Sequence, residues 1–141
     1  MRSFFLDTNV VIDFLAGRQP FAADAGFLFD SALKGNCHVF ISALSYHNIW
    51  YILRHSHRPA ALQKLLNDLG EISEIAPVST GAVKQALSSK GKDLEDALQF
   101  YSALELGTID ALITRNVKDF KFDGLAIMTP AEAVALQNST P

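Results

Sequence analysis

Short apolar runs alternate with longer amphipathic stretches along the whole chain. A short apolar run between turn-forming residues is typical of a buried strand, whereas apolar residues that recur every three or four positions are typical of a helix. The pattern predicts strands at residues 3–6, 38–41, 72–78, 109–113 and 125–128. It predicts helices at residues 10–16, 20–34, 44–56, 59–69, 80–88 and 94–106, and a last helix that starts at residue 130.

Several of these helices have recognisable ends. Gly17, Gly70 and Gly107 each follow an amphipathic stretch, and glycine often ends a helix because it adopts the left-handed conformation easily. Thr129 stands before a proline, which predicts an N-cap followed by proline in the first turn. Residues 138–141 are predicted to form a frayed tail.

Short strands that alternate with longer helices predict an α/β fold in which helices cover a parallel sheet. In such folds, ligands bind beyond the carboxyl ends of the strands. A chain of 141 residues fits one domain, so we expect a single domain over residues 1–141.

Composition and charge narrow the function classes. The net charge of −3 gives no basic footprint for nucleic-acid binding, but it is compatible with an enzyme that meets phosphate through a metal and a few cations. A single cysteine, Cys37, excludes an intramolecular disulfide. No apolar run approaches the roughly 20 residues that span a membrane. We therefore expect a cytoplasmic protein that does not associate with membranes.

Two acidic groups are candidates for chemistry. Asp7 ends the first predicted strand at the start of a helix, where it can serve as an N-cap or contribute to a site at the sheet edge. Asp93 and Asp96 share a face of their predicted helix because they are three residues apart. An acidic first turn with Asp93 as its cap explains Asp93 and Glu95. It explains Asp96 less well, since apolar residues flank that position.

A third polar segment, residues 114–120, directly follows the predicted strand at 109–113 and contains Asp119. It fits a simple polar turn, yet its position after a strand places it at the same edge of the sheet. Carboxylates brought together raise one another's pKa unless a cation neutralises them. Oxygen ligands without clustered cysteine or histidine favour Mg²⁺ or Mn²⁺ over Zn²⁺.

Four segments then stand out in order along the chain: LDTNV at residues 6–10, ISALS at 41–45, DLEDALQ at 93–99 and TRNVKDF at 114–120. Together they resemble the PIN-domain family over nearly the whole chain. The resemblance implies a three-layer α/β/α sandwich with a mostly parallel sheet of about four to five strands. It also implies RNA cleavage that depends on Mg²⁺ or Mn²⁺. Many small bacterial members are VapC-like toxins, which are often dimeric and are blocked by an antitoxin.

The resemblance assigns roles to particular residues. Asp7 and Asp96 match family acids that bind metal, and either Asp119 or Asn116 matches another. We expect Asp7, Asp96 and Asp119 to be the metal ligands, with Asp93 as a further catalytic acid.

Neighbouring polar residues are expected to orient the acids or to meet the substrate. Arg115 and Lys118 are expected to contact substrate phosphates. The residues expected to orient the metal ligands through hydrogen bonds are Thr8, Asn9, Asn48, Thr114 and Asn116.

One position departs from the family pattern. The family's second acid usually follows the segment at 41–45 by a few residues, where this chain has Asn48. An asparagine offers a carbonyl oxygen but no charge. The departure predicts weaker metal binding, a compensating charge from Asp93, or reduced or lost activity.

The expected function is therefore a Mg²⁺- or Mn²⁺-dependent ribonuclease, the toxin of a toxin–antitoxin pair. Its expected partners are RNA, an antitoxin protein and a second copy of the chain. The alternative is a PIN-like scaffold that binds RNA or a protein without cleaving. A phosphohydrolase for small phosphate esters ranks lowest, because the sequence has no evident motif for a small-molecule pocket.

Overall fold

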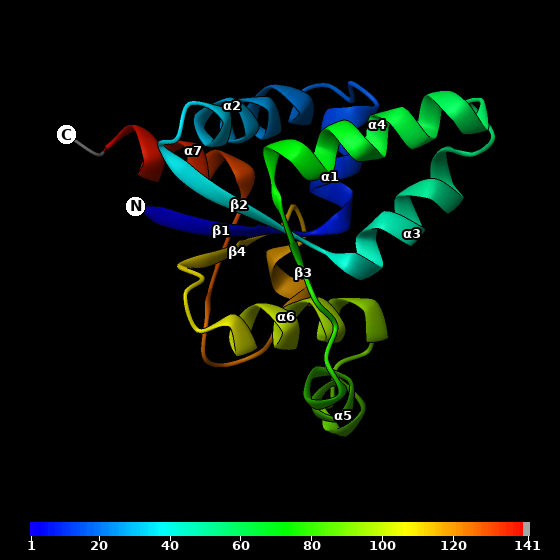
Figure 1. Ribbon diagram of the computed structural model, residues 1–141. Coiled ribbons are helices and arrows are strands. Elements are labelled where there is room, and N and C mark those ends of the chain that lie inside the picture. Colours follow the sequence, from blue (N-terminus) through cyan, green and yellow to red (C-terminus); the bar gives the residue numbers. More distant parts are fainter. Residues whose placement is uncertain (140–141) are drawn as a thin grey trace.

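The computed structural model describes residues 1–139 and places a parallel sheet between two layers of helices (Figure 1). The sheet has five strands in the order β3-β2-β1-β4-β5, so β1 lies at its centre, and every neighbouring pair is parallel. The predicted α/β/α sandwich is confirmed. The strands are β1 (Arg2–Leu6), β2 (Cys37–Ser42), β3 (Glu74–Ala76), β4 (Ala111–Ile113) and β5 (Ala126–Met128).

Helices cover both faces of the sheet. Helices α1, α2, α3, α4 and α7 lie over one face, and α5 and α6 lie over the other (Figure 1). The helices are α1 (Thr8–Leu15), α2 (Phe21–Leu33), α3 (Ala43–Leu53), α4 (Pro59–Ile72), α5 (Thr80–Ser88), α6 (Leu94–Leu106) and α7 (Pro130–Asn138), and a 3₁₀ helix η1 spans Val117–Asp119.

Each face of the sheet has its own core, because side chains alternate between the faces along a strand. Phe4 and Leu6 of β1 pack in the core under α1 to α4 and α7, whereas Phe5 packs in the core on the α6 side with Phe100. Burial of each such side chain contributes about 1.5–3 kcal/mol. Packing on both faces therefore fixes β1 firmly, and with it the residue that follows, Asp7.

Most predicted elements are present, with shifts at their ends. The prediction that Gly70 ends a helix is wrong, because α4 continues through it to Ile72. Leu69 is buried, and its packing carries the helix past the glycine. The predicted tail begins too early, since α7 includes Asn138; residues 140–141 of that prediction lie outside the described residues.

Within residues 1–139, no helix has the length and apolar character needed to cross a membrane.

Candidate active site

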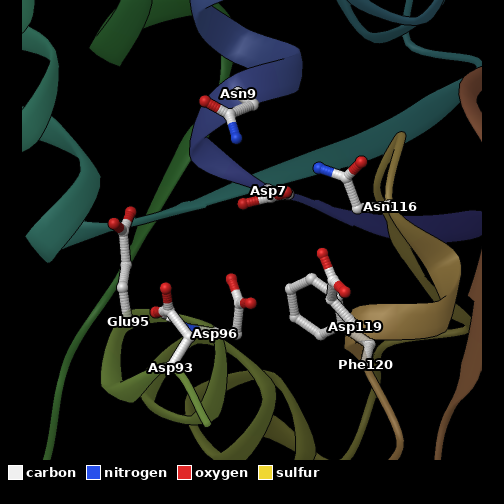
Figure 2. A pocket seen from close by; sticks show the side chains of 8 residues that line it. All are labelled: Asp7, Asn9, Asp93, Glu95, Asp96, Asn116, Asp119 and Phe120. Carbon is white, nitrogen blue, oxygen red and sulfur yellow. Dashed lines mark hydrogen bonds between the residues drawn. The ribbon is translucent and has the colours of Figure 1, made fainter.

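Parallel pairing brings the ends of β1 and β4 together. Leu6 pairs with Ile113 in the register of the two strands, and the next residues along the chain are Asp7 and Thr114. The backbone N–H of Asp7 donates to the carbonyl of Ile113 at 2.9 Å. The start of α6 faces the same edge of the sheet (Figure 2). Residues about a hundred positions apart therefore meet at one point, as the strand pattern predicts.

The Asp7 carboxylate is buried and held by two side-chain donors. Asp7 is 3% exposed, and Gln99 Nε2 donates to its Oδ1 at 3.0 Å. Thr114 Oγ1 donates to Oδ2 at 2.8 Å. Although Asp7 occupies the N-cap position of α1, its side chain makes no capping hydrogen bond. Capping therefore does not account for this carboxylate, and the two donors fix its orientation instead.

Gln99 is a functional candidate that the sequence analysis missed. It is fully buried on α6, where its Nε2 donates to Asp7 and its Oε1 accepts from the backbone N–H of Thr8 at 3.0 Å. The Thr8 hydroxyl lies 2.6 Å from the hydroxyl of Ser45, which extends the buried network to α3. The available signal was a glutamine on the apolar face of a helix, since a buried amide needs hydrogen-bonding partners.

A polar pocket with a volume of about 250 Å³ opens beside Asp7. Figure 2 shows the carboxylates of Asp7, Asp96 and Asp119 reaching toward the same space from the end of β1, from α6 and from η1. The structure thus brings together the three acids that were expected to bind metal. The pocket is lined by Asp7, Asn9, Asp93, Glu95, Asp96, Asn116, Asp119 and Phe120.

The first turn of α6 supplies two further acids of different kinds. Asp93 is the N-cap of α6, and its Oδ1 accepts from the backbone N–H of Asp96 at 3.1 Å. Glu95 makes no such bond yet also lines the pocket. From the sequence, the helix dipole alone accounted for Glu95, so this position was not among the predicted site residues. Helical spacing alone does not show which of two adjacent acids faces a pocket.

Crowding and burial raise the pKa of two of these carboxyls. Burial raises the pKa of Asp7 above its ordinary value, although the hydrogen bonds from Gln99 and Thr114 oppose the rise. Burial, together with repulsion from the four other carboxylates of the pocket, raises the pKa of Asp96 to about 7. Near neutral pH the pocket therefore favours a bound proton or a bound cation over a full set of bare negative charges.

The donor set fits a hard divalent cation in its chemistry. The pocket offers carboxylate and amide oxygens, with no sulfur and no histidine among its lining residues. However, the side chains that line the pocket do not form a coordination shell as they stand. In the part of the chain from residue 1 to 139, no three acidic, histidine or cysteine side chains are arranged to hold an ion as they stand.

The supporting residues divide into three groups by position. Asn9 and Asn116 line the pocket. Thr8 and Thr114 are buried behind it, in the hydrogen-bond network of Asp7. Asn48, half-buried on α3, does not line the pocket, so the structure does not place an oxygen from this position among the acids.

The two cations that were expected at substrate phosphates have different surroundings. Arg115 is bound to Asp13, with Nε 2.6 Å from Oδ2, and its guanidinium lies 4.2 Å from the centre of the Phe21 ring. Asp13 is 1% exposed and was not singled out by the sequence analysis. This partly buried ion pair ties α1 to the segment that carries Asn116, so Arg115 has a structural partner. Lys118 is exposed and lines a second cavity beside the pocket.

Comparison with known proteins identifies the family. The model of the PIN domain matches residues 3–118, which is most of the chain. The chain belongs to the PIN-domain family, a family of nucleases. The resemblance of the four sequence segments to this family is thereby confirmed. No curated protein matches the chain.

Three solved structures share the fold. One is VapBC2 from Rickettsia felis bound to a DNA fragment from its promoter, with 21% identity, a TM-score of 0.64, and coverage of 89% of this chain and 96% of that chain. Another is a toxin–antitoxin complex from Klebsiella pneumoniae, with 25% identity, a TM-score of 0.62 and the same coverage. The third is VapC20 from Mycobacterium tuberculosis, a toxin that cleaves the sarcin–ricin loop, with 19% identity, a TM-score of 0.59, and coverage of 86% and 90%.

The network around Asp7 predicts that Gln99→Met destabilises the protein. Methionine has a similar shape but no N–H group and no carbonyl, so Asp7 loses a donor and the Thr8 N–H loses its acceptor. An unsatisfied buried group costs about 1–3 kcal/mol. We expect the free energy of unfolding, measured with urea at neutral pH, to fall by that amount. Gln85→Met, at an exposed position of α5, is the control and should change it by less than about 0.5 kcal/mol. Equal effects of the two variants would contradict the assigned role of Gln99.

Proposed function

We propose that this protein is a ribonuclease that hydrolyses phosphodiester bonds with Mg²⁺ or Mn²⁺, and that it is the toxin of a toxin–antitoxin pair. The observation that carries the proposal is the meeting of Asp7, Asp96 and Asp119 in one pocket at the carboxyl edge of the sheet. Asp7 adds weight because it is buried as a carboxylate without serving as a cap. Burying an ionisable group costs free energy, and such groups are concentrated at functional sites.

Asp7, Asp96 and Asp119 would hold the cation. When bound, such an ion stabilises charge on the phosphoryl oxygens and makes a water molecule more acidic and more nucleophilic. The chain's own residues supply the rest. Gln99 and Thr114 keep Asp7 in one orientation through their hydrogen bonds. Asn9 and Asn116 present amide groups to the same space, where they orient water or a phosphate oxygen.

Glu95 supplies the charge that Asn48 lacks. The family pattern has an acid near position 48, whereas this chain has an uncharged amide that lies outside the pocket lining. Glu95 lines the pocket, and its charge contributes to the raised pKa of both Asp7 and Asp96. Asp93 also lines the pocket, but one of its oxygens is engaged in capping α6. Glu95 therefore has more freedom than Asp93 to approach a cation.

Proteins that share this fold support the proposed RNA substrate and the proposed antitoxin partner. VapC20 is a toxin that cleaves the sarcin–ricin loop, and the Klebsiella structure is a toxin–antitoxin complex. We propose for this chain an RNA substrate, an antitoxin that covers the acidic pocket, a homodimeric state and a cytoplasmic location.

A second candidate function is a PIN-like scaffold that binds RNA or a protein without cleaving. Two observations favour it: the amide at Asn48, and the lack of a ready coordination shell among residues 1–139. The two functions make opposite predictions about metal-dependent turnover.

RNA cleavage should depend on a divalent metal ion and on Asp96. Purified protein should degrade a mixed RNA pool in Mg²⁺ or Mn²⁺, EDTA should stop the reaction, and Asp96→Asn should lower the rate more than about 100-fold. That size follows because changing an outer-shell partner of a metal alone typically costs about 10–100-fold. Far-UV circular dichroism should show that the variant is folded. Asp68→Asn, on the exposed side of α4, is the charge-matched control and should keep full activity. Cleavage that persists in EDTA, or normal turnover by Asp96→Asn, would rule out the metal mechanism.

The metal dependence of cleavage should distinguish the role of Glu95 from that of Asp93. Glu95→Gln should raise the Mg²⁺ concentration for half-maximal cleavage by about tenfold, within the range expected when a supporting group is lost. Asp93→Asn should raise it less, and it should leave stability nearly unchanged because asparagine is as good an N-cap as aspartate. Glu71→Gln removes an exposed charge from α4, at a position that does not line the pocket, and serves as the control. If Glu95→Gln and Glu71→Gln had the same Mg²⁺ concentration for half-maximal cleavage, Glu95 would not supply the charge that Asn48 lacks.

A further inference from the structure

A second cavity, with a volume of about 860 Å³, adjoins the acidic pocket. The cavity and the acidic pocket are adjacent, because Asp93, Asp96 and Asp119 line both of them. The walls of the second cavity come from the segment at 88–93, between α5 and α6, and from the segment at 118–123, which follows β4. We call it the lysine cavity, because Lys90, Lys92, Lys118 and Lys121 line it.

The lysine cavity concentrates the chain's free ammonium groups. It holds four of the seven lysines in the sequence, and all four are exposed. In residues 1–139, none of the four is in an ion pair, whereas Lys34 and Lys64 pair with Asp30 and Asp68. Apart from the three acids shared with the pocket, only Asp123 offsets them. With those acids occupied by a cation, the cavity is positive although the whole chain carries −3.

The floor of the cavity is aromatic. Tyr101 and Phe122 line it, with ring centres 5.7 Å apart in an edge-to-face arrangement, and both are half-buried. Phe122 also stacks on buried Phe100 at 4.8 Å, which anchors the floor to the core. The 88–93 segment lies directly on this floor, since a Cβ at Gly91 would come within 3.0 Å of the Phe122 ring. That contact holds Lys90 and Lys92 at the edge of the cavity.

We propose that the lysine cavity binds a single-stranded stretch of RNA next to the phosphate positioned in the acidic pocket. Unpaired ammonium groups meet the backbone phosphates, and the aromatic floor packs against a base. This combination is how proteins bind single strands with little sequence preference. A duplex would keep its bases stacked inside, away from the floor. The inference rests on the proposed ribonuclease function and names the path that the substrate follows.

The test measures binding separately from cleavage. A short fluorescein-labelled poly(U) oligonucleotide is titrated with the Asp96→Asn protein in Mg²⁺ over a series of KCl concentrations, and Kd is read by fluorescence anisotropy. In that background, Lys90→Gln/Lys92→Gln and Lys118→Gln/Lys121→Gln should each weaken binding. Each pair should also reduce the slope of log Kd against log[KCl] by about 1.4, since a lost contact with a single strand changes it by about 0.7. Lys84→Gln, which removes an exposed lysine of α5 outside the cavity, should change neither.

Three results of the binding experiment would overturn the proposal. The first is that the two double variants behave like Lys84→Gln. The second is that the parent protein does not bind poly(U) even at the lowest salt concentration. The third is that a polyglutamate peptide competes as well as unlabelled poly(U), which would assign the cavity to an acidic protein segment. Cleavage by the wild type is assayed separately. If RNA binding depends on the lysines but the wild type does not cleave RNA, only the proposed ribonuclease activity is refuted. If the wild type cleaves RNA and the rate does not depend on the four lysines, only the proposed RNA path through the lysine cavity is refuted.

Discussion

The buried carboxylate of Asp7 is the constraint on which the rest of the site depends. A charged group buried to this extent is tolerated only where hydrogen-bond donors contact it. Gln99 reaches it from α6 and Thr114 from the end of β4, so a helix and two strands must all be in register for the carboxylate to be held. The double-sided packing of β1 provides that register, because Phe4 and Phe5 anchor the central strand in opposite cores. The fold thereby provides one buried, fixed acid to which less buried acids are added.

Those added acids create the second feature of the site, which is electrostatic repulsion. The pKa of Asp96 is raised to about 7 by burial and by the surrounding carboxylates. In its unfolded state this group releases its proton at a much lower pH, so the metal-free protein should lose stability as the pH rises from about 4 toward 7. A divalent cation relieves the same repulsion. The arrangement costs stability in the empty state, and it is typical of a site that functions when loaded.

Periodicity was sufficient to predict the architecture, and the ends of parallel strands predicted where Asp7 and Asp119 lie. Asp96 lies on a helix, and its grouping with the other two acids as metal ligands was implied by the resemblance to the PIN-domain family. The sequence was not sufficient where the answer depends on the direction of a side chain. Gln99 and Glu95 both lie on α6, yet only the packed structure shows that one holds Asp7 and the other faces the pocket. Arg115 looked like a phosphate ligand until its long-range partner, Asp13, was visible. Gly70 was predicted to end a helix because local propensity gives no information about the burial of Leu69.

The central claim is that the carboxylate cluster exchanges protons for a divalent cation. Titration calorimetry of Mn²⁺ or Mg²⁺ into the protein near pH 7, in two buffers of different ionisation enthalpy, measures both binding and the number of protons released. Our account predicts that the wild type binds the ion and releases a fraction of a proton, and that Asp96→Asn binds more weakly and releases less. The absence of metal binding by the wild type, or equal proton release by the two proteins, would contradict it.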